Sequence, residues 1–429
     1  MKIALPWLTA LLTVLPVLSA SADPWPSWRG DAEGSGSTDE TGLPTSWGPE
    51  KNVRWRVDLP ERGNSTPVIS GGRVFVSQAV DAENFRGLLC FDRADGKLLW
   101  KSGVTYAKPE RSHRDNPYCS ASPVTDGEHV FVSYGSAGVA CYDFSGKEIW
   151  RRELGPIDHE WGNSTSPVLS GDLCILYHGP GTGASLVALN KKSGEIVWSL
   201  EEPIWQPGKR TDGFRDRSDR GVIGSFSTPI IIEAGGRKEL VMSFPMELRS
   251  YDPATGKERW RCAGLNPLVY TSPVHDDGVI VAMGGYYGNS IGVKLGGEGD
   301  ITEKGRLWQE IRHVGGIGSG VAKDGNLYVQ DSGGVAYCID MQTGETLWEE
   351  RLPGKGKSWG SFVLAGDLIY TLSQPGDSVV FKADPDKFEV LAQSDLKEHT
   401  NSSIAISDGE LFIRTHEALW CIGDGTKQL

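Results

Sequence analysis

The feature that most constrains this chain is a short hairpin pattern that recurs along almost its whole length. The clearest copy is YDPATGKERW at 251–260: an apolar strand, a polar turn with Gly, and a short strand that ends in Trp. Gly takes the positive φ that such a turn requires, so the pattern predicts an antiparallel hairpin. The tryptophans at this position are Trp55, Trp100, Trp150, Trp198, Trp260, Trp308 and Trp348.

The spacing of these tryptophans indicates the architecture. From Trp100 onward they are separated by 50, 48, 62, 48 and 40 residues, the range of one four-stranded propeller blade. A repeat of this size cannot bury its own apolar face, and a flat Trp on each copy offers a surface to pack against the next. We therefore predict an all-β propeller that forms a single domain over residues 52–423.

The number of blades follows from the starts of the repeats. Each start is expected to be an innermost strand, where Pro and small residues suit the crowded axis. Eight starts predict eight four-stranded antiparallel blades, with seven as the runner-up. They are Thr66-Pro67, Ser122-Pro123, Ser166-Pro167, Thr228-Pro229, Ser272-Pro273, Gly320-Val321, Phe362-Val363 and Ser403-Ile404. The eighth repeat stops at Ile422, one strand short, so we expect the strand around Trp55 to complete the last blade.

The two ends of the chain carry further signals. Residues 1–22 combine Lys2, an apolar run and the small-residue stretch Ala20-Ser21-Ala22, which predicts a cleaved secretory signal. A membrane anchor is the alternative, but the run is shorter than the roughly 20 residues of a span. We expect export to the periplasm or beyond, without a transmembrane segment, and without lipidation because no Cys lies near the cleavage site. Residues 23–51 are expected to be a lead segment laid over the surface and otherwise flexible, and 424–429 a C-terminal tail.

Charge and cysteine content narrow the classes of partner. A formal net charge of −13 disfavours nucleic acid and anionic membranes. Four cysteines occupy the same position in different repeats, which indicates small buried strand residues and not a disulfide framework: Cys90, Cys141, Cys338 and Cys421. Whether Cys119 and Cys262 pair stays open. There is no CxxC motif and no adjacent Cys pair, so we expect no metal or dithiol site.

With the repeats aligned, the chain resembles a known family. The pattern apolar-x-Asp-x-x-Thr-Gly-Lys-x-x-Trp, in 249–260 and in variants at 89–100 and 337–348, resembles the PQQ-like β-propeller repeat, also called quinoprotein alcohol dehydrogenase-like. The opening WPSWRG at 25–30 is similar to exported members of that family. The resemblance implies one of two functions: a non-catalytic, BamB-like binding or scaffold protein, or a dehydrogenase of alcohols or sugars that uses pyrroloquinoline quinone (PQQ) and Ca²⁺. The chain lacks the adjacent Cys pair of many alcohol-oxidising members and the lipidation Cys of BamB.

The loops that link each blade's outer strand to the next inner strand are the expected ligand face. Three of them, at 103–119, 155–163 and 201–226, are long and charged. They would offer Arg and His to an anionic or sugar-like group, with Trp as a flat platform. The alternative is a solvated loop set whose charges pair with one another. The candidate binding residues are His113, Arg114, Asp115, His159, Trp161, Arg215, Asp216, Arg217, Arg220 and Trp359.

The leading hypothesis is a monomeric, exported, non-catalytic propeller that binds a protein or a glycan through this charged loop face. It predicts no catalytic residue, no metal and no cofactor. In the alternative, Ca²⁺ would need Glu, Asn and Asp oxygens, and residues of those types, such as Asn116, Asp158 and Glu160, stand in the same loops. Three Asn-x-Ser/Thr sequences begin at Asn64, Asn163 and Asn401, and we interpret them as structural because they mark inner-strand starts.

Overall fold

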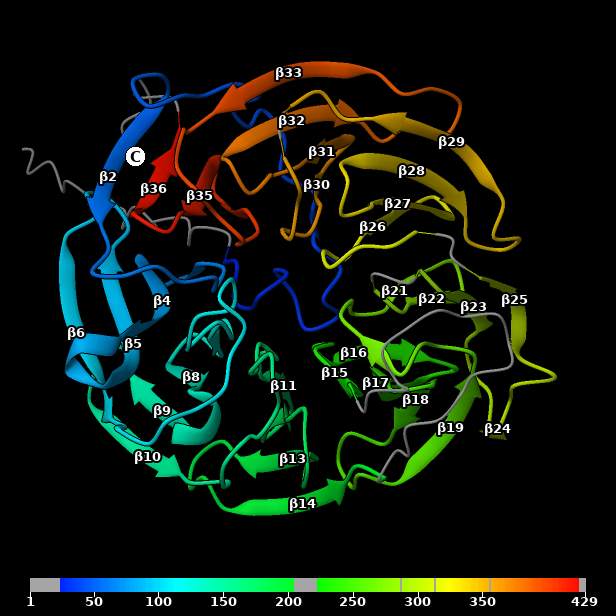
Figure 1. Ribbon diagram of the computed structural model, residues 1–429, viewed down its shortest axis with the longest axis horizontal. Coiled ribbons are helices and arrows are strands. Elements are labelled where there is room, and N and C mark those ends of the chain that lie inside the picture. Colours follow the sequence, from blue (N-terminus) through cyan, green and yellow to red (C-terminus); the bar gives the residue numbers. More distant parts are fainter. Residues whose placement is uncertain (1–23, 204–221, 286–287, 312–313, 355, 424–429) are drawn as a thin grey trace, which may run out of the picture.

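The computed structural model describes residues 24–203, 222–285, 288–311, 314–354 and 356–423. Within these residues the chain forms eight antiparallel blades of four strands each, arranged in a ring around a central axis (Figure 1). The first strand of each blade lies beside the axis and the fourth at the circumference. The prediction of an all-β propeller with eight blades is confirmed, and seven blades are excluded.

In blades 1 to 7 the strands follow the chain from the axis outward. Blade 1 is β3–β6 (Val68–Ser70, Arg73–Val80, Phe85–Asp92, Leu98–Thr105) and blade 2 is β7–β10 (Val124–Thr125, His129–Ser133, Val139–Asp143, Glu148–Arg152). Blade 3 is β11–β14 (Val168–Ser170, Leu173–His178, Ser185–Asn190, Ile196–Glu201) and blade 4 is β16–β19 (Ile230–Ala234, Arg237–Phe244, Glu247–Tyr251, Glu258–Ala263). Two short 3₁₀ turns, η1 (Asp81–Glu83) and η2 (Gly135–Ala137), lie in blades 1 and 2.

The second half of the ring repeats this order. Blade 5 is β21, β22, β23 and β25 (Val274–Asp276, Val279–Met283, Ser290–Lys294, Arg306–Glu310), and blade 6 is β26–β29 (Val321–Lys323, Asn326–Gln330, Val335–Asp340, Thr346–Arg351). Blade 7 is β30–β33 (Val363–Ala365, Leu368–Tyr370, Asp377–Lys382, Val390–Asp395), and blade 8 begins with β34–β36 (Ala405–Ser407, Glu410–Arg414, Ala418–Ile422). A separate two-stranded ladder joins β15 (Gly224–Ser225) to β20 (Leu268–Val269).

An N-terminal strand closes the ring, as predicted. Strand β2 (Val53–Asp58) pairs antiparallel with β36, and Trp55 lies opposite Cys421. Blade 8 therefore takes three strands from the C-terminal end of the chain and its outermost strand from near the N-terminus (Figure 1). This shared blade ties both ends of the propeller into one sheet and leaves no unpaired edge between blades 8 and 1.

The repeated tryptophans join neighbouring blades. Six of them donate their indole N–H to a backbone carbonyl of the next blade at 2.6–3.1 Å: Trp55 to Arg93, Trp100 to Phe144, Trp150 to Lys191, Trp198 to Pro253, Trp308 to Met341 and Trp348 to Asp384. In five of these six pairs the turn Gly of the next blade packs on the indole face, as Gly146 does on Trp100. A Cβ on Gly146 would lie 2.6 Å from the ring. The turn of blade 7, next to Trp348, has no Gly, and Phe388 packs against that ring instead. The turn Gly thus serves both the positive φ of the hairpin and the contact between blades.

Trp260 departs from this pattern because blade 5 has a longer connection between its third and fourth strands. That connection carries β24 (Gly299–Asp300), which pairs in parallel with β19 and places Gly299 opposite Trp260. Trp260 is fully buried, and its indole N–H donates to the Glu239 carboxylate within its own blade at 2.7 Å. Arg237 and Ser250 also bond to Glu239, so this buried carboxylate is paired.

Hydroxyl groups close the inner circumference. The backbone N–H of a Ser or Thr at the start of each inner strand donates to the side-chain hydroxyl of the equivalent residue in the next blade, at 2.8–3.3 Å. The eight residues of this hydroxyl ring are Thr66, Ser122, Ser166, Thr228, Ser272, Ser319, Ser361 and Ser403, and the last N–H donates back to Thr66. In blades 6 and 7 the expected starts, Gly320 and Phe362, were one residue late: the equivalent positions are Ser319 and Ser361.

The lead segment does not lie on the surface, which corrects the expectation for its first half. Residues 24–38 cross the channel in the middle of the ring (Figure 1). Trp25 exchanges two backbone hydrogen bonds with Ile69 of blade 1, and the carbonyl of Ala32 accepts from Ile231 of blade 4. Strand β1 (Ser37–Thr38) then pairs in parallel with β30 of blade 7. The segment therefore closes the channel at the end where the inner strands finish.

Arg29 holds the lead segment to the opposite wall. Its guanidinium donates to the carbonyls of Ser319 and Gly320 in the hydroxyl-ring region of blade 6 and to those of Gly34 and Ser35 in its own segment. Arg29 is only 2% exposed, and burial lowers its pKa to about 10. Further along, Trp47 is also buried and stacks on Tyr370 of blade 7.

The seven cysteines are all buried free thiols. Four of them lie directly opposite a blade tryptophan: Cys90 with Trp100, Cys141 with Trp150, Cys338 with Trp348 and Cys421 with Trp55. This confirms that they are equivalent small residues of the repeat. Cys119 and Cys262, whose pairing the sequence left open, do not form a disulfide.

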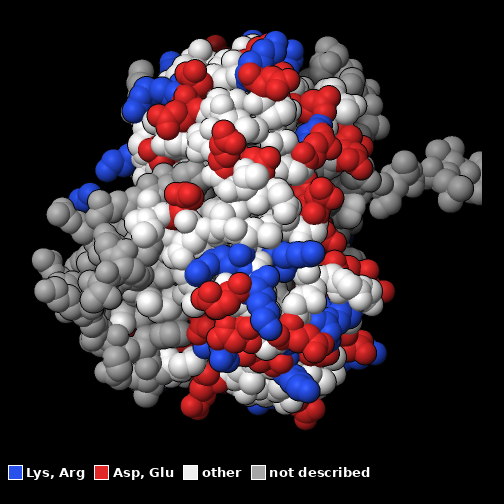
Figure 2. Space-filling view, turned by 90° about the vertical axis from the view of Figure 1, so that its right-hand side faces the viewer, with Lys and Arg blue, Asp and Glu red and all other residues white. Residues whose placement is uncertain are grey.

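The outside of the ring carries charges of both signs. Figure 2 shows Lys and Arg side chains interleaved with Asp and Glu on the side of the ring that it presents. Pairs of this kind on blade 4 join Arg261 to Glu258 and Asp300, and Arg237 to Glu298. The described part of the chain contains no helix that is long and apolar enough to span a membrane.

Replacing the turn Gly of blade 2 tests the tryptophan contact. Gly146→Ala places a methyl group against Trp100, whereas Gly127→Ala, in the same blade and also at positive φ, meets no atom within 4 Å. Both variants carry the backbone strain, so the difference between them isolates the contact. We expect Gly146→Ala to lower the unfolding free energy by about 1–3 kcal/mol more than Gly127→Ala in urea denaturation. Equal losses would show that the turn needs Gly for its backbone alone.

Arg29→Met tests the attachment of the lead segment. Removing four charged hydrogen bonds should speed hydrogen exchange of residues 24–38 by about tenfold or more, since each such bond contributes about 1.5–3 kcal/mol. Mass spectrometry of that peptide measures the effect. Lys51→Met is the matched control, because this exposed cation of the same segment bonds only to Ser46 among the described contacts. Unchanged exchange in Arg29→Met would mean that the backbone pairing holds the segment alone.

Candidate functional site

A pocket of about 670 Å³ lies on the axis, at the end of the channel where the inner strands begin. The lead segment closes it below, where Trp28 lines it, and loops from several blades surround its mouth. The channel is therefore a blind pocket and not an open tunnel. The described residues that line it are Trp28, Asn64, Thr66, Ser112, His113, Arg114, Asn116, Ser120, Ser122, Glu160, Trp161, Ser164, Ser166, Phe226, Thr228, Tyr270, Ile317, Trp359, Ser361, Asn401 and Ser403.

Six members of the hydroxyl ring form the wall of the pocket. They are Thr66, Ser122, Ser166, Thr228, Ser361 and Ser403, and each is at most 5% exposed. Each hydroxyl oxygen accepts one backbone N–H from the neighbouring blade. Among the described contacts, none of the six hydroxyls donates its own hydrogen. The wall therefore offers converging O–H donors to a ligand on the axis.

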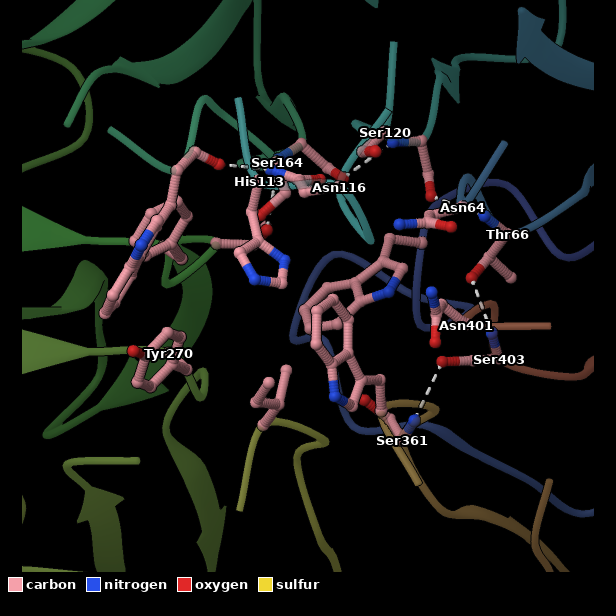
Figure 3. Close-up of a pocket in the computed structure, with 18 of the residues that line it drawn as sticks. Asn64, Thr66, His113, Asn116, Ser120, Ser164, Tyr270, Ser361, Asn401 and Ser403 are labelled. Atoms are coloured by element: carbon pink, nitrogen blue, oxygen red, sulfur yellow. Dashed lines mark hydrogen bonds between the residues drawn. The ribbon is translucent and has the colours of Figure 1, made fainter. Parts of the chain in front are cut away.

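Three asparagines fix the loops around the mouth. Asn64 and Asn401 both donate their side-chain N–H to the carbonyl of Asp115, at 2.9 and 3.2 Å, which attaches the loop of blade 1 to blade 8. Asn116 donates to the carbonyl of Trp161 at 2.8 Å and joins the next loop. Figure 3 shows Asn64 and Asn401 together on one side of the pocket. Their side chains have structural bonds, in keeping with the interpretation of the Asn-x-Ser/Thr sequences, and they also line the site.

Aromatic rings occupy two sides of the pocket. On one side Tyr270 stacks between Trp161 and Phe226, with ring centroids 6.2 and 5.6 Å apart. Across the pocket Trp359 packs against His113 at 6.2 Å. Figure 3 shows Tyr270 facing His113 across the open space. Flat apolar faces of this kind accept the planar or C–H face of a ligand.

The charged groups at the mouth lie close to one another. Asp115 is 3.7 Å from the His113 ring nitrogen and 3.6 Å from Arg114, whose side chain is 86% exposed. Behind Asn64, the rings of His416 and His399 are 4.5 Å apart. Burial, with the charges of neighbouring His399 and arginines, lowers the pKa of His416 to about 4. Glu160 is the one carboxylate among the described residues of the lining.

A buried cation stands behind the hydroxyl wall. Arg414 is fully buried between blades 8 and 1 and donates to the Ser65 hydroxyl, the Ser77 carbonyl and the Gln78 amide oxygen at 2.5–2.7 Å. Burial lowers its pKa to about 9. Ser65 lies between Asn64 and Thr66 of the lining, so the guanidinium is one residue removed from the pocket.

The structure brings together part of the residue set expected from the sequence. His113, Arg114, Trp161 and Trp359 line the pocket, and Asp115 supports its rim. His159 lies beneath the site, where it packs edge-on against Trp161 and Phe226, and burial lowers its pKa. Four expected residues lie outside the described residues: Arg215, Asp216, Arg217 and Arg220.

Sequence reasoning missed the wall and the floor. The Ser and Thr residues of the hydroxyl ring were interpreted only as the starts of repeats. Their recurrence in every repeat was the signal that could have identified them as a ring around the axis. Trp28 was assigned to a surface segment. Tyr270 and Phe226 each stand two residues before a member of the hydroxyl ring, Ser272 and Thr228, a position that the alignment of repeats identifies once the axis is known.

Comparisons with known proteins agree with the propeller fold. A family model described as outer membrane protein assembly factor BamB matches residues 37–116, 84–350 and 299–416. The outer membrane protein assembly factor BamB of Yersinia pestis is 24% identical over 280 residues, which cover 63% of this chain and 64% of that protein. A europium-containing methanol dehydrogenase superposes with a TM-score of 0.67 at 11% identity, over 91% of this chain and 89% of that one.

BamB from Moraxella catarrhalis superposes with a TM-score of 0.57 at 13% identity, over 85% of this chain and 98% of that one. At these identities the likeness to solved structures shows the fold alone. The family match is broader, because its three segments together extend from residue 37 to residue 416. On that match, the chain belongs to the PQQ-like β-propeller family described as outer membrane protein assembly factor BamB.

Proposed function

We propose that this chain is a non-catalytic, exported binding or scaffold protein that holds a protein or glycan partner at the loop face, with part of the partner in the axial pocket. The observation that supports this proposal is the axial pocket. Its floor, wall and mouth come from segments far apart in the sequence, and its volume of about 670 Å³ is within the range of about 300–1,000 Å³ for ligand sites.

The groups in the pocket favour binding over catalysis. Stacked aromatic rings, hydroxyl donors and amides hold a ligand by surface contact and hydrogen bonds. Among the described residues of the lining, no Ser hydroxyl is in hydrogen-bond contact with a His ring, which is the arrangement by which a His activates a Ser nucleophile. His113 instead accepts the backbone N–H of Asp115, and Ser112 donates to the carbonyl of Asn116.

A quinoprotein dehydrogenase is the second candidate, favoured by the fold of the methanol dehydrogenase neighbour. The described side chains do not fit its cofactor. Ca²⁺ takes six to eight oxygen ligands, with carboxylates prominent, whereas Glu160 is the one described carboxylate of the lining. In the described ranges, three or more His, Cys, Asp or Glu side chains nowhere gather into a possible metal site. No redox step through PQQ is therefore derived for this chain.

The proposed location rests on the sequence and on the relatives. Yersinia pestis BamB is named an outer membrane protein assembly factor, which supports an envelope setting for this chain as well. The predicted signal ends at residue 22, and Trp25 already makes backbone hydrogen bonds inside the ring. We propose cleavage at that point and a mature protein without a lipid anchor.

Trp161→Ala combined with Trp359→Ala tests the binding face. Because both rings stand at the mouth, we expect the double variant to retain less than about a tenth of the partner that the wild type captures from envelope extract, a loss equivalent to about 1.4 kcal/mol or more. Quantitative mass spectrometry of the captured proteins and glycans is the measurement. The conservative pair Trp161→Phe and Trp359→Phe should keep most of the binding.

The matched control removes exposed side chains elsewhere. Ile149→Ser with Val197→Ser changes outer strands of blades 2 and 3, where these residues are 40% and 52% exposed. We expect the control to capture the wild-type set of partners. If the pocket variant captures that same set in the same amounts, the loop face is not the binding surface.

Titration with PQQ and Ca²⁺ separates the two candidates. Since the described lining offers one carboxylate to the metal, we expect calorimetry to show no saturable binding at micromolar PQQ, and no dye reduction with alcohols or sugars. Saturable binding with turnover of any of these substrates would establish the dehydrogenase and reject the scaffold.

A further inference from the structure

Buried cations lie next to the axial pocket, although the net charge of the chain is −13. Two guanidinium groups flank this pocket. Arg29 lies beside Trp28 of the floor, with its guanidinium 5.7 Å from that ring, and bonds to the carbonyl of the ring residue Ser319. Arg414 lies behind Thr66 and bonds to the neighbouring Ser65. They are 2% and 0% exposed.

Neither guanidinium donates to a carboxylate among the described contacts. Arg29 donates to four carbonyl oxygens, and Arg414 to one hydroxyl, one carbonyl and one amide oxygen. Asp31 offsets part of the Arg29 charge at longer range. Of the acidic groups near the pocket, Glu160 is part of its lining, and Asp115 lies in a loop at its rim. Buried charges are ordinarily paired, so this arrangement leaves positive potential at the inner end of the pocket.

The hydroxyl groups of the pocket wall favour an anionic ligand, as the two buried arginines do. Six buried hydroxyl oxygens accept backbone N–H groups. Among the described contacts these hydroxyls donate to no protein group, so their hydrogens can point to a ligand oxygen on the axis. Converging O–H donors beside buried cations stabilise an anionic oxygen and disfavour a cation or an apolar group. The inner end of the pocket is therefore built for an acid group.

The outer part of the pocket has a different chemistry. Trp161, Tyr270 and Phe226 form one flat wall and Trp359 another, at half-buried positions above the hydroxyls. Such faces pack against the C–H face of a sugar ring, whose hydroxyls can bond to the polar rim. A ligand that satisfies both parts has a ring of this kind with an acid group attached.

We infer that the axial pocket binds a uronic acid, with its carboxylate toward the hydroxyl ring and its sugar face against the aromatic walls. This inference rests on the proposed function, because it names the ligand of the binding pocket. The uronic acid is either a free monosaccharide or the end of a glycan chain. The volume of about 670 Å³ accommodates more than one sugar unit, which favours a chain end.

Fluorescence titration tests this inference, because Trp28, Trp161 and Trp359 line the pocket and report its occupancy. The probes are glucuronate, glucose as the neutral sugar that lacks the carboxylate, acetate as a carboxylate without a sugar, and a glucuronate-terminated disaccharide. We expect saturable binding of glucuronate at least about tenfold tighter than that of glucose or acetate, and binding of the disaccharide at least as tight as that of glucuronate.

Each other result overturns part of the assignment. Equal affinity for glucose rejects the role of the acid group, equal affinity for acetate rejects the role of the sugar, and no binding of any probe rejects the inference. A glucuronate affinity well above that of the disaccharide rejects the chain end in favour of the free sugar. If the pocket Trp variants still abolish partner capture while no probe binds, the proposed function stands and only this ligand is wrong.

Variants locate the binding. Arg414→Met should reduce glucuronate affinity about tenfold and leave glucose affinity unchanged, since it removes a buried positive charge near the acid group. If Arg414→Met does not fold, Trp359→Ala and Trp359→Phe replace it: the first should lose glucuronate binding and the second should keep it. Lys51→Met, remote from the lining, is the control for both series. Wild-type affinity in Arg414→Met or Trp359→Ala would reject the pocket as the site.

Discussion

The closed ring of eight N–H to hydroxyl hydrogen bonds around the axis is the constraint on which the rest of the structure depends. Each bond needs a Ser or Thr at one position of one strand in every blade, and that requirement sets the register of the inner strands relative to one another. Six of these eight hydroxyls also form the wall of the pocket, because an oxygen that accepts one hydrogen bond still has its own hydrogen to donate. Scaffold and site therefore share atoms, and a substitution in this ring affects both.

A second set of contacts acts at the circumference. There the indole N–H of one blade bonds to a carbonyl of the next, and the turn Gly packs on the indole face. The two sets of contacts act at different distances from the axis. The hydroxyls join the blades beside the axis, where neighbouring blades are closest, and the tryptophans fill the wider space between blades at the circumference. Trp260 shows how the outer contact tolerates change, since the longer connection in blade 5 covers it and Glu239 accepts its N–H within the blade.

The sequence sufficed for features that repeat. The hairpin with its Gly and Trp specified the blades and the closure by Trp55, since each copy has the same local geometry, and the repeat starts with Ser, Thr and Pro specified the number of blades. The pocket was predictable in part: His113, Arg114, Trp161 and Trp359 follow from the position of their loops. The path of the lead segment was not predictable: the sequence led to the expectation of a surface segment, and its partners Ile69, Ile231 and Ser319 lie in different blades. Contacts across the axis have no periodic signature, which is also why Trp28 and the buried Arg414 were missed.

The path of the lead segment has a consequence for the order of assembly. Residues 24–38 precede all eight blades in the sequence, yet they bond to blades 1, 2, 4, 6 and 7. The segment can reach its final place only after blade 7 exists, and β2 can pair with β36 only after the chain is nearly complete. In a partly synthesised ring the axial channel is therefore not yet closed by the lead segment. The floor of the axial pocket thus forms late, in the step that joins the two ends of the propeller.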